Sequence, residues 1–157
     1  RLHTKIRYAI KALDCEIIFL DHLSIVVSEF ADSLERTAID TTMTKLRSLV
    51  SETGCAMVIV SHLSRSSGTP HEEGGQVSLS QLRGSHSIAQ LSDICIGLER
   101  SQQEEDPAIS NLMHIRILKN RYSGETGPSG YIRFDPETGR LHNHEDEPDI
   151  DTEFDDL

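Results

Sequence analysis

The apolar positions in the first half of the chain predict helices and strands in alternation. Residues 2–13 carry apolar side chains at helical spacing, and residues 16–20 are a short apolar run. Residues 35–52 return to helical spacing, with Gly54 as a helix-ending residue, and residues 55–62 are a second apolar run. A strand, a helix and a strand in this order predict a parallel crossover. Strands that are apolar throughout are typical of a sheet covered on both faces.

Two segments between these elements, residues 23–34 and residues 64–78, read as loops. The second is rich in Ser, Gly and Pro, and we expect it to be long and mobile. Further strands are expected at residues 94–99, 112–119 and 131–135. The turn-forming residues 136–139 follow the last of these, so we expect the chain to finish its folded part with a β-hairpin.

Charge divides the chain into a body and a tail. The 157 residues carry a net charge of −11, and eight acidic residues without any Lys or Arg lie in residues 142–157. The body, residues 1–141, has 15 basic and 18 acidic residues, which gives −3. We expect one domain over the body and a disordered tail, because the tail has too little apolar surface to offset the entropy of ordering.

The composition indicates a cytoplasmic protein. No apolar run approaches the roughly 20 residues that a membrane span needs, and no signal peptide is visible. Cys15, Cys55 and Cys95 are scattered in apolar segments, which favours reduced thiols over disulfides or a zinc site. The chain begins with Arg rather than Met, and we interpret it as a fragment.

Two strand ends carry polar residues that suit phosphate chemistry. Asp21 follows the apolar run EIIFL, where an aspartate can hold Mg²⁺ through water near nucleotide phosphates. His62 ends the next run, where it could hydrogen-bond a γ-phosphate. Parallel sheets bind ligands at the carboxyl ends of their strands, so the two are expected at one edge. The alternative for each is an ordinary polar residue at a strand end.

A segment later in the chain could contact a nucleic-acid backbone. Arg83, Gly84 and Ser85 offer a charge, a close backbone approach and a hydroxyl group, and Arg65 adds a second charge. The alternative is a helix start that Ser85 caps.

Lys119 and Arg121 lead out of a strand into a Gly-rich turn. An arginine in such a place can reach across a subunit interface and neutralise charge in the transition state of phosphoryl transfer. The alternative is a pair of solvent-exposed charges at the end of a strand.

The order of these segments carries a family resemblance. The runs LDHLSIVVSE, MVIVSHLSR, RGSHSIAQLSD and LKNRYSGETG resemble the helicase half of podovirus-type bifunctional primase–helicases, in the DnaB-like helicase superfamily. The resemblance covers nearly all of residues 1–141. It implies an α/β fold, a RecA-like three-layer sandwich with a mostly parallel sheet. The N-terminal strands and the phosphate-binding loop of that fold are missing from this chain.

The resemblance also implies roles at the nucleotide. Asp21 corresponds to the Walker B aspartate that holds Mg²⁺ through water, and His62 to the γ-phosphate sensor. Arg121 corresponds to the arginine finger acting in trans, with Lys119 beside it. Phe134 falls where the family has an aromatic residue that stacks on the base of the nucleotide, ATP or dTTP. The alternative for Phe134 is a core strand residue.

Partners follow from the same resemblance. Arg83, Gly84 and Ser85 correspond to the segment that meets single-stranded DNA in the channel of a homo-oligomeric ring, expected to be a hexamer. Arg100 corresponds to a basic residue of that motif region. The acidic tail, with Phe154 as its apolar anchor, corresponds to a segment that binds the replicative DNA polymerase.

The chain departs from the family pattern in several places. It contains no GxxxxGK[ST] motif and lacks the catalytic glutamate expected upstream, so we expect the isolated chain not to hydrolyse NTP. The loop after His62 has few lysines, and Ala89 stands where a basic residue is expected. Two other functions stay open: a RecA-type recombinase, and a non-catalytic module that tethers polymerase through its tail.

Overall fold

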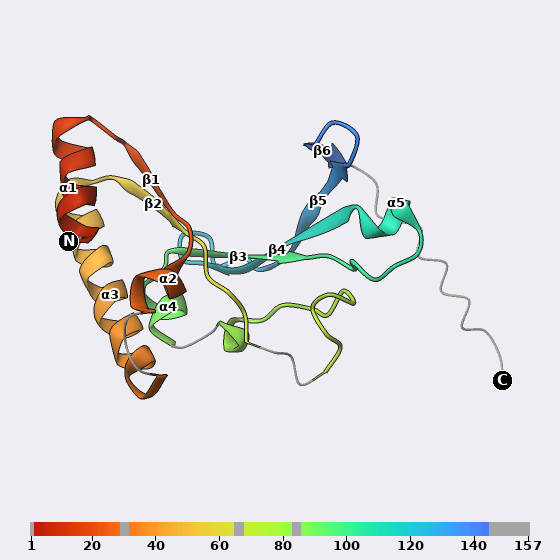
Figure 1. The fold of residues 1–157 in the computed structure, drawn as a ribbon, viewed down its shortest axis with the longest axis horizontal. Helices are drawn as coiled ribbons and strands as arrows, with labels where there is room; N and C mark the ends of the chain where they lie inside the picture. Colours follow the sequence, from red (N-terminus) through yellow and green to blue (C-terminus); the bar gives the residue numbers. More distant parts are fainter. Residues whose placement is uncertain (1, 29–31, 65–67, 83–85, 145–157) are drawn as a thin grey trace. The chain divides into compact units, whose positions relative to one another are not determined.

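The computed structural model describes residues 2–28, 32–64, 68–82 and 86–144 (Figure 1). These residues form two compact units, and the chain passes between them more than once. The first unit contains residues up to 64 and residues 78–93, and the second contains residues 68–77 and those from 94 onward.

The first unit is an α/β unit with a short parallel sheet. Its elements are α1 (Leu2–Ala12), β1 (Ile17–Leu20), α2 (Leu23–Val27), α3 (Asp32–Thr53), β2 (Ala56–Ile59), the 3-10 turn η1 (Leu79–Gln81) and α4 (His86–Leu91). Strand β1 pairs in parallel with β2, and Leu20 lies opposite Ile59. The predicted parallel strand–helix–strand crossover is therefore confirmed.

The core of this unit follows the helical stripe of α3. Ile39, Met43, Leu46 and Leu49, spaced three or four residues apart, are each at most 3% exposed. One end of the stripe packs against Ile6 of α1, and the other end packs against α2 and α4. The predicted apolar face of this helix is thus the face that holds the unit together.

The prediction of a loop over residues 23–34 is wrong for its first part. Residues Leu23–Val27 form α2, and α3 begins at Asp32 rather than at residue 35. Leu23 and Val27 lie four residues apart and are each 1% exposed, so burial of this pair drives a helical turn. The β-branched residues between them obscured the pattern, because they disfavour helices by intrinsic propensity.

The two faces of the parallel strands differ in exposure. Leu20 and Ile59 pack against the helices, together with the neighbouring Ile18 and Met57. The opposite face exposes Ile17 (55%), Phe19 (75%) and Val58 (46%). The expectation that both faces of the sheet are covered is therefore confirmed for the face toward the helices. It is not met on the other face within the described residues.

The second unit is an antiparallel sheet with strand order β3-β4-β5-β6. Its elements are β3 (Ile94–Glu99), α5 (Pro107–Ser110), β4 (Leu112–Asn120), β5 (Gly127–Asp135) and β6 (Arg140–His144). The predicted C-terminal hairpin is confirmed by the pairing of β5 with β6. Strand β5 begins four residues earlier than expected, because its glycine-rich start pairs with β4.

The segment expected to be a long mobile loop folds compactly over residues 68–77. Glu73 forms a β-bridge with Ser101, and the Gly75 N–H donates to Pro70 O over 3.0 Å. A Cβ atom at position 75 would lie 2.2 Å from Thr69 O, so only glycine fits there. The composition of the segment does not predict backbone hydrogen bonds of this kind.

No helix in the described part of the chain is long and apolar enough to cross a membrane.

The packing predicts a contrast between two leucines. Leu46→Ala should lower the free energy of unfolding by about 2–5 kcal/mol, because Leu46 is 1% exposed in the α3 stripe. The matched change Leu13→Ala, at a site 61% exposed, should cost less than about 0.5 kcal/mol. Urea denaturation followed by helical circular dichroism measures both, and equal losses would contradict this account of the core.

Candidate functional site

The carboxyl edge of the parallel strands gathers three polar residues. Asp21 follows β1 directly and is exposed, and His62 lies three residues after the end of β2 and is also exposed. The rings of His22 and His62 are in contact in a tilted arrangement, with centroids 4.1 Å apart and an interplanar angle of 34°. The structure thus brings the ends of both strands together at one edge, as the sequence predicted for Asp21 and His62.

Backbone hydrogen bonds fix this edge. Val60 N–H donates to Leu20 O over 2.9 Å, which continues the ladder beyond the last strand pair. Leu23 N–H then donates to Val60 O over 3.0 Å, at the start of α2. The loop that carries Asp21 and His22 is therefore tied to the backbone just before His62. His22 was missed from sequence, although its place next to Asp21 was a usable signal.

Asp21 suits a magnesium site of the kind that nucleotides share with proteins. Mg²⁺ in such sites keeps several waters and takes one or two carboxylates together with phosphate oxygens. An exposed carboxylate at a strand end fits that role through water. Among the described residues no group of three or more His, Cys, Asp or Glu side chains could hold a metal by itself. A metal here would depend on the phosphates of a nucleotide.

The second unit places Lys119 and Arg121 at the end of β4. Lys119 pairs with Cys95 of β3, and Arg121 is exposed at the start of the following turn. The side chain of Asn120 shapes this turn by accepting hydrogen bonds from the N–H groups of Tyr122 (3.0 Å) and Ser123 (3.3 Å). Arg121 therefore stands on a defined turn rather than on an unstructured loop.

Arg100 and Phe134 lie together in the second unit. The Arg100 guanidinium carbon is 5.8 Å from the centre of the Phe134 ring, within cation–π range. Arg100 Nε donates to Ser110 O over 2.5 Å, and its Nη2 donates to the side chain of Asn111 over 3.1 Å. The guanidinium is thus held in place beside an aromatic ring, and the predicted DNA contact of Arg100 stays a prediction.

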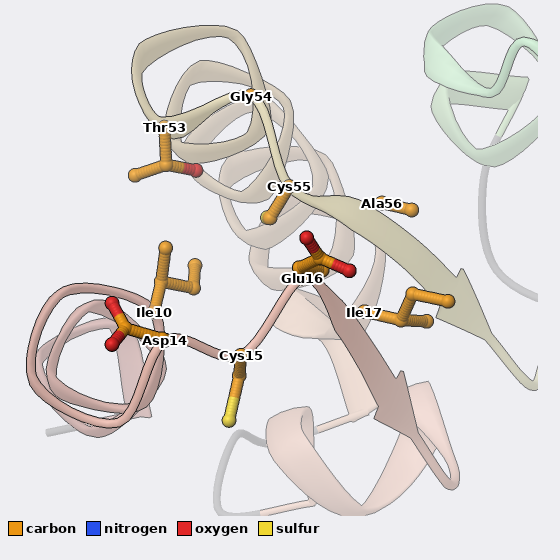
Figure 2. A pocket seen from close by; sticks show the side chains of 9 residues that line it. All are labelled: Ile10, Asp14, Cys15, Glu16, Ile17, Thr53, Gly54, Cys55 and Ala56. Carbon is orange, nitrogen blue, oxygen red and sulfur yellow. The ribbon is translucent and has the colours of Figure 1, made fainter.

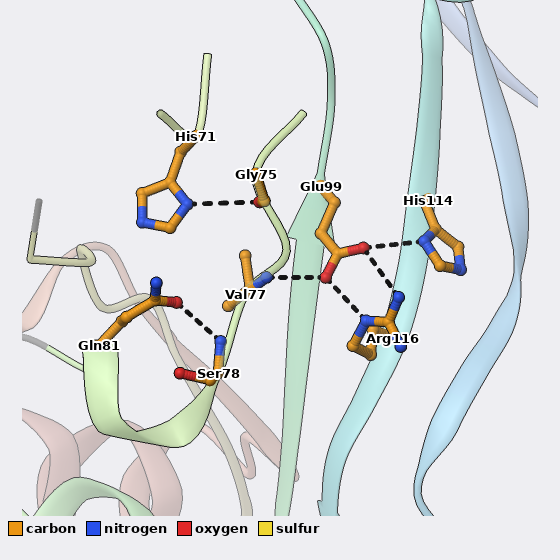
Figure 3. Close-up of polar contacts among 8 residues, drawn as sticks. All are labelled: His71, Gly75, Val77, Ser78, Gln81, Glu99, His114 and Arg116. Carbon is orange, nitrogen blue, oxygen red and sulfur yellow. Dashed lines mark hydrogen bonds and ion pairs between the residues drawn. The ribbon is translucent and has the colours of Figure 1, made fainter. Parts of the chain in front are cut away.

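A buried carboxylate, which sequence reasoning did not single out, joins three segments of the second unit (Figure 3). Glu99 accepts hydrogen bonds from Val77 N–H (2.8 Å), from Arg116 Nε (2.7 Å) and from His114 Nδ1 (2.8 Å). A carboxylate only accepts, so His114 carries its proton on Nδ1. Its ring stacks on Tyr131 with centroids 4.7 Å apart. Glu99 therefore ties residues 68–77 and β4 to β3, beside Arg100.

Opposing effects set the pKa of Glu99. Burial raises the pKa, but the hydrogen bonds from Arg116, Val77 and His114 and the charge of Arg116 outweigh it, so the pKa lies below its usual range. A depressed pKa stabilises the fold above the ordinary glutamate pKa of about 4.3, and this stability is lost as pH falls through the folded pKa.

Several candidate residues lie outside the described part of the chain. These are the proposed DNA-contacting residues Arg65, Arg83, Gly84 and Ser85, and the tail anchor Phe154.

A hollow in the first unit lies at the opposite end of the parallel strands (Figure 2). It is lined by residues near the ends of α1 and α3, by the first residue of each strand, and by Cys15, Glu16 and Cys55 just before the strands. These are the amino ends of β1 and β2, whereas parallel sheets bind ligands at the carboxyl ends. We therefore place the candidate site at the edge with Asp21 and His62.

Comparison with known proteins decides the family. Residues 1–143 match the family described as the DnaB-like helicase C-terminal domain. The chain belongs to the DnaB-like helicase C-terminal domain family. It is also 46% identical over 142 residues to the DNA helicase/primase of Enterobacteria phage T3. The predicted resemblance to phage primase–helicases is therefore confirmed. That alignment covers 90% of this chain but 25% of the phage T3 protein, so the chain spans about a quarter of this relative's length.

Solved structures confirm the expected RecA-like fold class. A DnaB-like replicative helicase, whose structure was reported with its interactions with primase, aligns with a TM-score of 0.69 at 23% identity. That alignment covers 92% of this chain and 34% of that one. A KaiC-like protein from Pyrococcus horikoshii OT3 aligns with a TM-score of 0.60 at 14% identity, over 91% of this chain and 55% of that one. At these identities the likeness concerns the fold alone.

The Glu99 cluster predicts a strong contrast with a surface ion pair. Glu99→Ala should destabilise this DnaB-like domain by about 3–5 kcal/mol at neutral pH, because it leaves Arg116, 18% exposed, without its buried partner. Glu52→Ala, which removes the exposed partner of Arg7, should cost less than about 1 kcal/mol. Chemical denaturation measures both, and the cost of Glu99→Ala should shrink below about pH 4. A cost independent of pH would contradict the role given to the Glu99 charge.

Proposed function

We propose that this chain is the C-terminal part of the motor domain of a replicative DNA helicase, which couples NTP hydrolysis to translocation on single-stranded DNA and to duplex unwinding. The observation that carries the proposal is the carboxyl edge of β1 and β2, where Asp21 lies with the His22 and His62 rings, which are in contact. The family and the 46% identity to the phage T3 helicase/primase support it.

Within this proposal each residue has a task in the hydrolysis of ATP or dTTP. Mg²⁺, when bound, would neutralise charge on the phosphates, and Asp21 would hold it through water. His62 would hydrogen-bond the γ-phosphate and respond to its loss. Arg121 would reach the nucleotide of a neighbouring subunit and neutralise developing charge. Phe134 would stack on the base, with Arg100 packed against the same ring.

The 157 residues would not hydrolyse NTP by themselves, because phosphoryl transfer depends on positioning and the GxxxxGK[ST] cradle is absent from them. The activity is therefore proposed for a longer protein that works in the cytoplasm as a homo-oligomeric ring of six subunits, by analogy with the family. Arg65, Arg83, Gly84 and Ser85 would face the DNA. The exposed apolar face with Phe19 and Val58 is suited to burial by further segments of a larger domain.

Arg121 gives the most direct mutational test in the complete protein. Arg121→Ala should lower DNA-stimulated NTP turnover by about a thousandfold or more, the usual worth of an arginine finger, while nucleotide binding persists. Arg140→Ala, at an exposed arginine of the same unit, serves as the matched control and should keep near-normal turnover. Near-normal turnover of Arg121→Ala would rule out the finger. Strand exchange without unwinding by the parent protein would favour a recombinase instead.

Through its acidic tail, the chain would bind one partner, the replicative DNA polymerase that works with this helicase. Eight acidic residues around Phe154 suit a basic surface with one apolar pocket. Phe154→Ala should weaken polymerase binding about tenfold, as loss of an aromatic anchor does, whereas the matched Ile150→Ala should change it little. Calorimetry with the 157-residue chain measures both. Equal affinity of the parent and Phe154→Ala would exclude the anchor.

A further inference from the structure

The two histidines at the candidate edge differ in how firmly they are held. His62 is exposed, whereas His22 is half-buried and its Nδ1 is fully buried. His22 is also fixed through its backbone, because the next residue, Leu23, is 1% exposed in the core and donates its N–H to Val60 O. An exposed histidine samples several rotamers unless something restricts it. The one ring contact that restricts His62 among the described residues is the tilted contact with the His22 ring, whose centroid lies 4.1 Å away.

We propose that His22 is a positioning residue whose ring serves as the platform for His62. Through this ring contact, the firmly held His22 at the start of α2 restricts the exposed His62 side chain after β2. A side chain that hydrogen-bonds a γ-phosphate must be held in one position, because a misplacement of about 1 Å can cost a hundredfold in rate. The catalytic consequence rests on the proposed function, whereas the ring contact itself does not.

The platform requires a flat ring and not a ring nitrogen. Within the described residues the buried Nδ1 of His22 makes no hydrogen bond, and a buried polar atom in that state costs roughly 1–3 kcal/mol. His22→Phe removes that polar atom and keeps an aromatic ring for the contact, so it should fold at least as stably as the parent. His22→Ala removes the surface. The two variants therefore separate the ring from its nitrogen.

Nuclear magnetic resonance on the 157-residue chain tests the ring contact directly. In the parent and in His22→Phe, the His62 ring protons should be shifted upfield by the neighbouring ring. In His22→Ala they should move to the positions of a free histidine. The ring protons of His142, 57% exposed on β6, serve as an internal control and should not move. A His62 ring unaffected by His22→Ala would overturn the proposal, whatever the activity of the complete protein.

Turnover in the complete protein tests the consequence. His22→Ala should lower kcat about tenfold or more and leave KM within about twofold, because the sensor is misplaced while the nucleotide still binds. His22→Phe should stay within about threefold of the parent in both parameters. If His22→Phe lost as much turnover as His22→Ala, the nitrogen rather than the ring would be needed, and the platform would be wrong. A parent protein without any NTPase activity would refute the proposed function and leave the resonance result standing.

Discussion

The parallel pairing of β1 with β2 is the constraint on which the candidate site depends. Because Leu20 lies opposite Ile59, the two strands end at the same edge, and the residues that follow them must share it. The α3 stripe enforces this register by burying Leu20 and Ile59 on its own side. A slip of one residue would turn these side chains to the other face and separate Asp21 from His62. Packing in the core thus sets the geometry of the edge.

In the second unit, a single buried charge, that of Glu99, holds the functional segments in place. Glu99 holds the segment at Val77, the Arg116 side chain of β4 and the end of β3 in one cluster. Its neighbour Arg100 packs against Phe134. The strand of Arg116, β4, contains Lys119 and ends at Asn120, just before Arg121. Phe134, expected at a nucleotide base, therefore belongs to a sheet that the buried Glu99–Arg116 ion pair stabilises, and Arg121, expected at a subunit interface, directly follows a strand of the same sheet.

Much of the fold and of the candidate edge was predictable, because the spacing of apolar residues and the ends of strands are local properties of the sequence. The α3 stripe, the parallel crossover and the C-terminal hairpin follow from spacing alone, and the shared edge of Asp21 and His62 follows from the crossover. Helix α2 was not predictable in the same way, since β-branched residues hide its buried pair. The Glu99 cluster and the ring contact of His22 with His62 depend on residues 15 or more positions apart, which no local pattern encodes. The roles of Arg83 and its neighbours remain predictions from resemblance.

The central claim is that the carboxyl edge of β1 and β2 faces the phosphates of a bound nucleotide. The measurement that tests it most directly is a structure of the complete protein with Mg²⁺ and a non-hydrolysable NTP. The Asp21 carboxylate is expected to hold the Mg²⁺ through water. The His62 ring is expected within hydrogen-bond reach of the γ-phosphate, with the His22 ring in contact with it. A nucleotide bound elsewhere, with Asp21 and His62 facing only solvent, would contradict it.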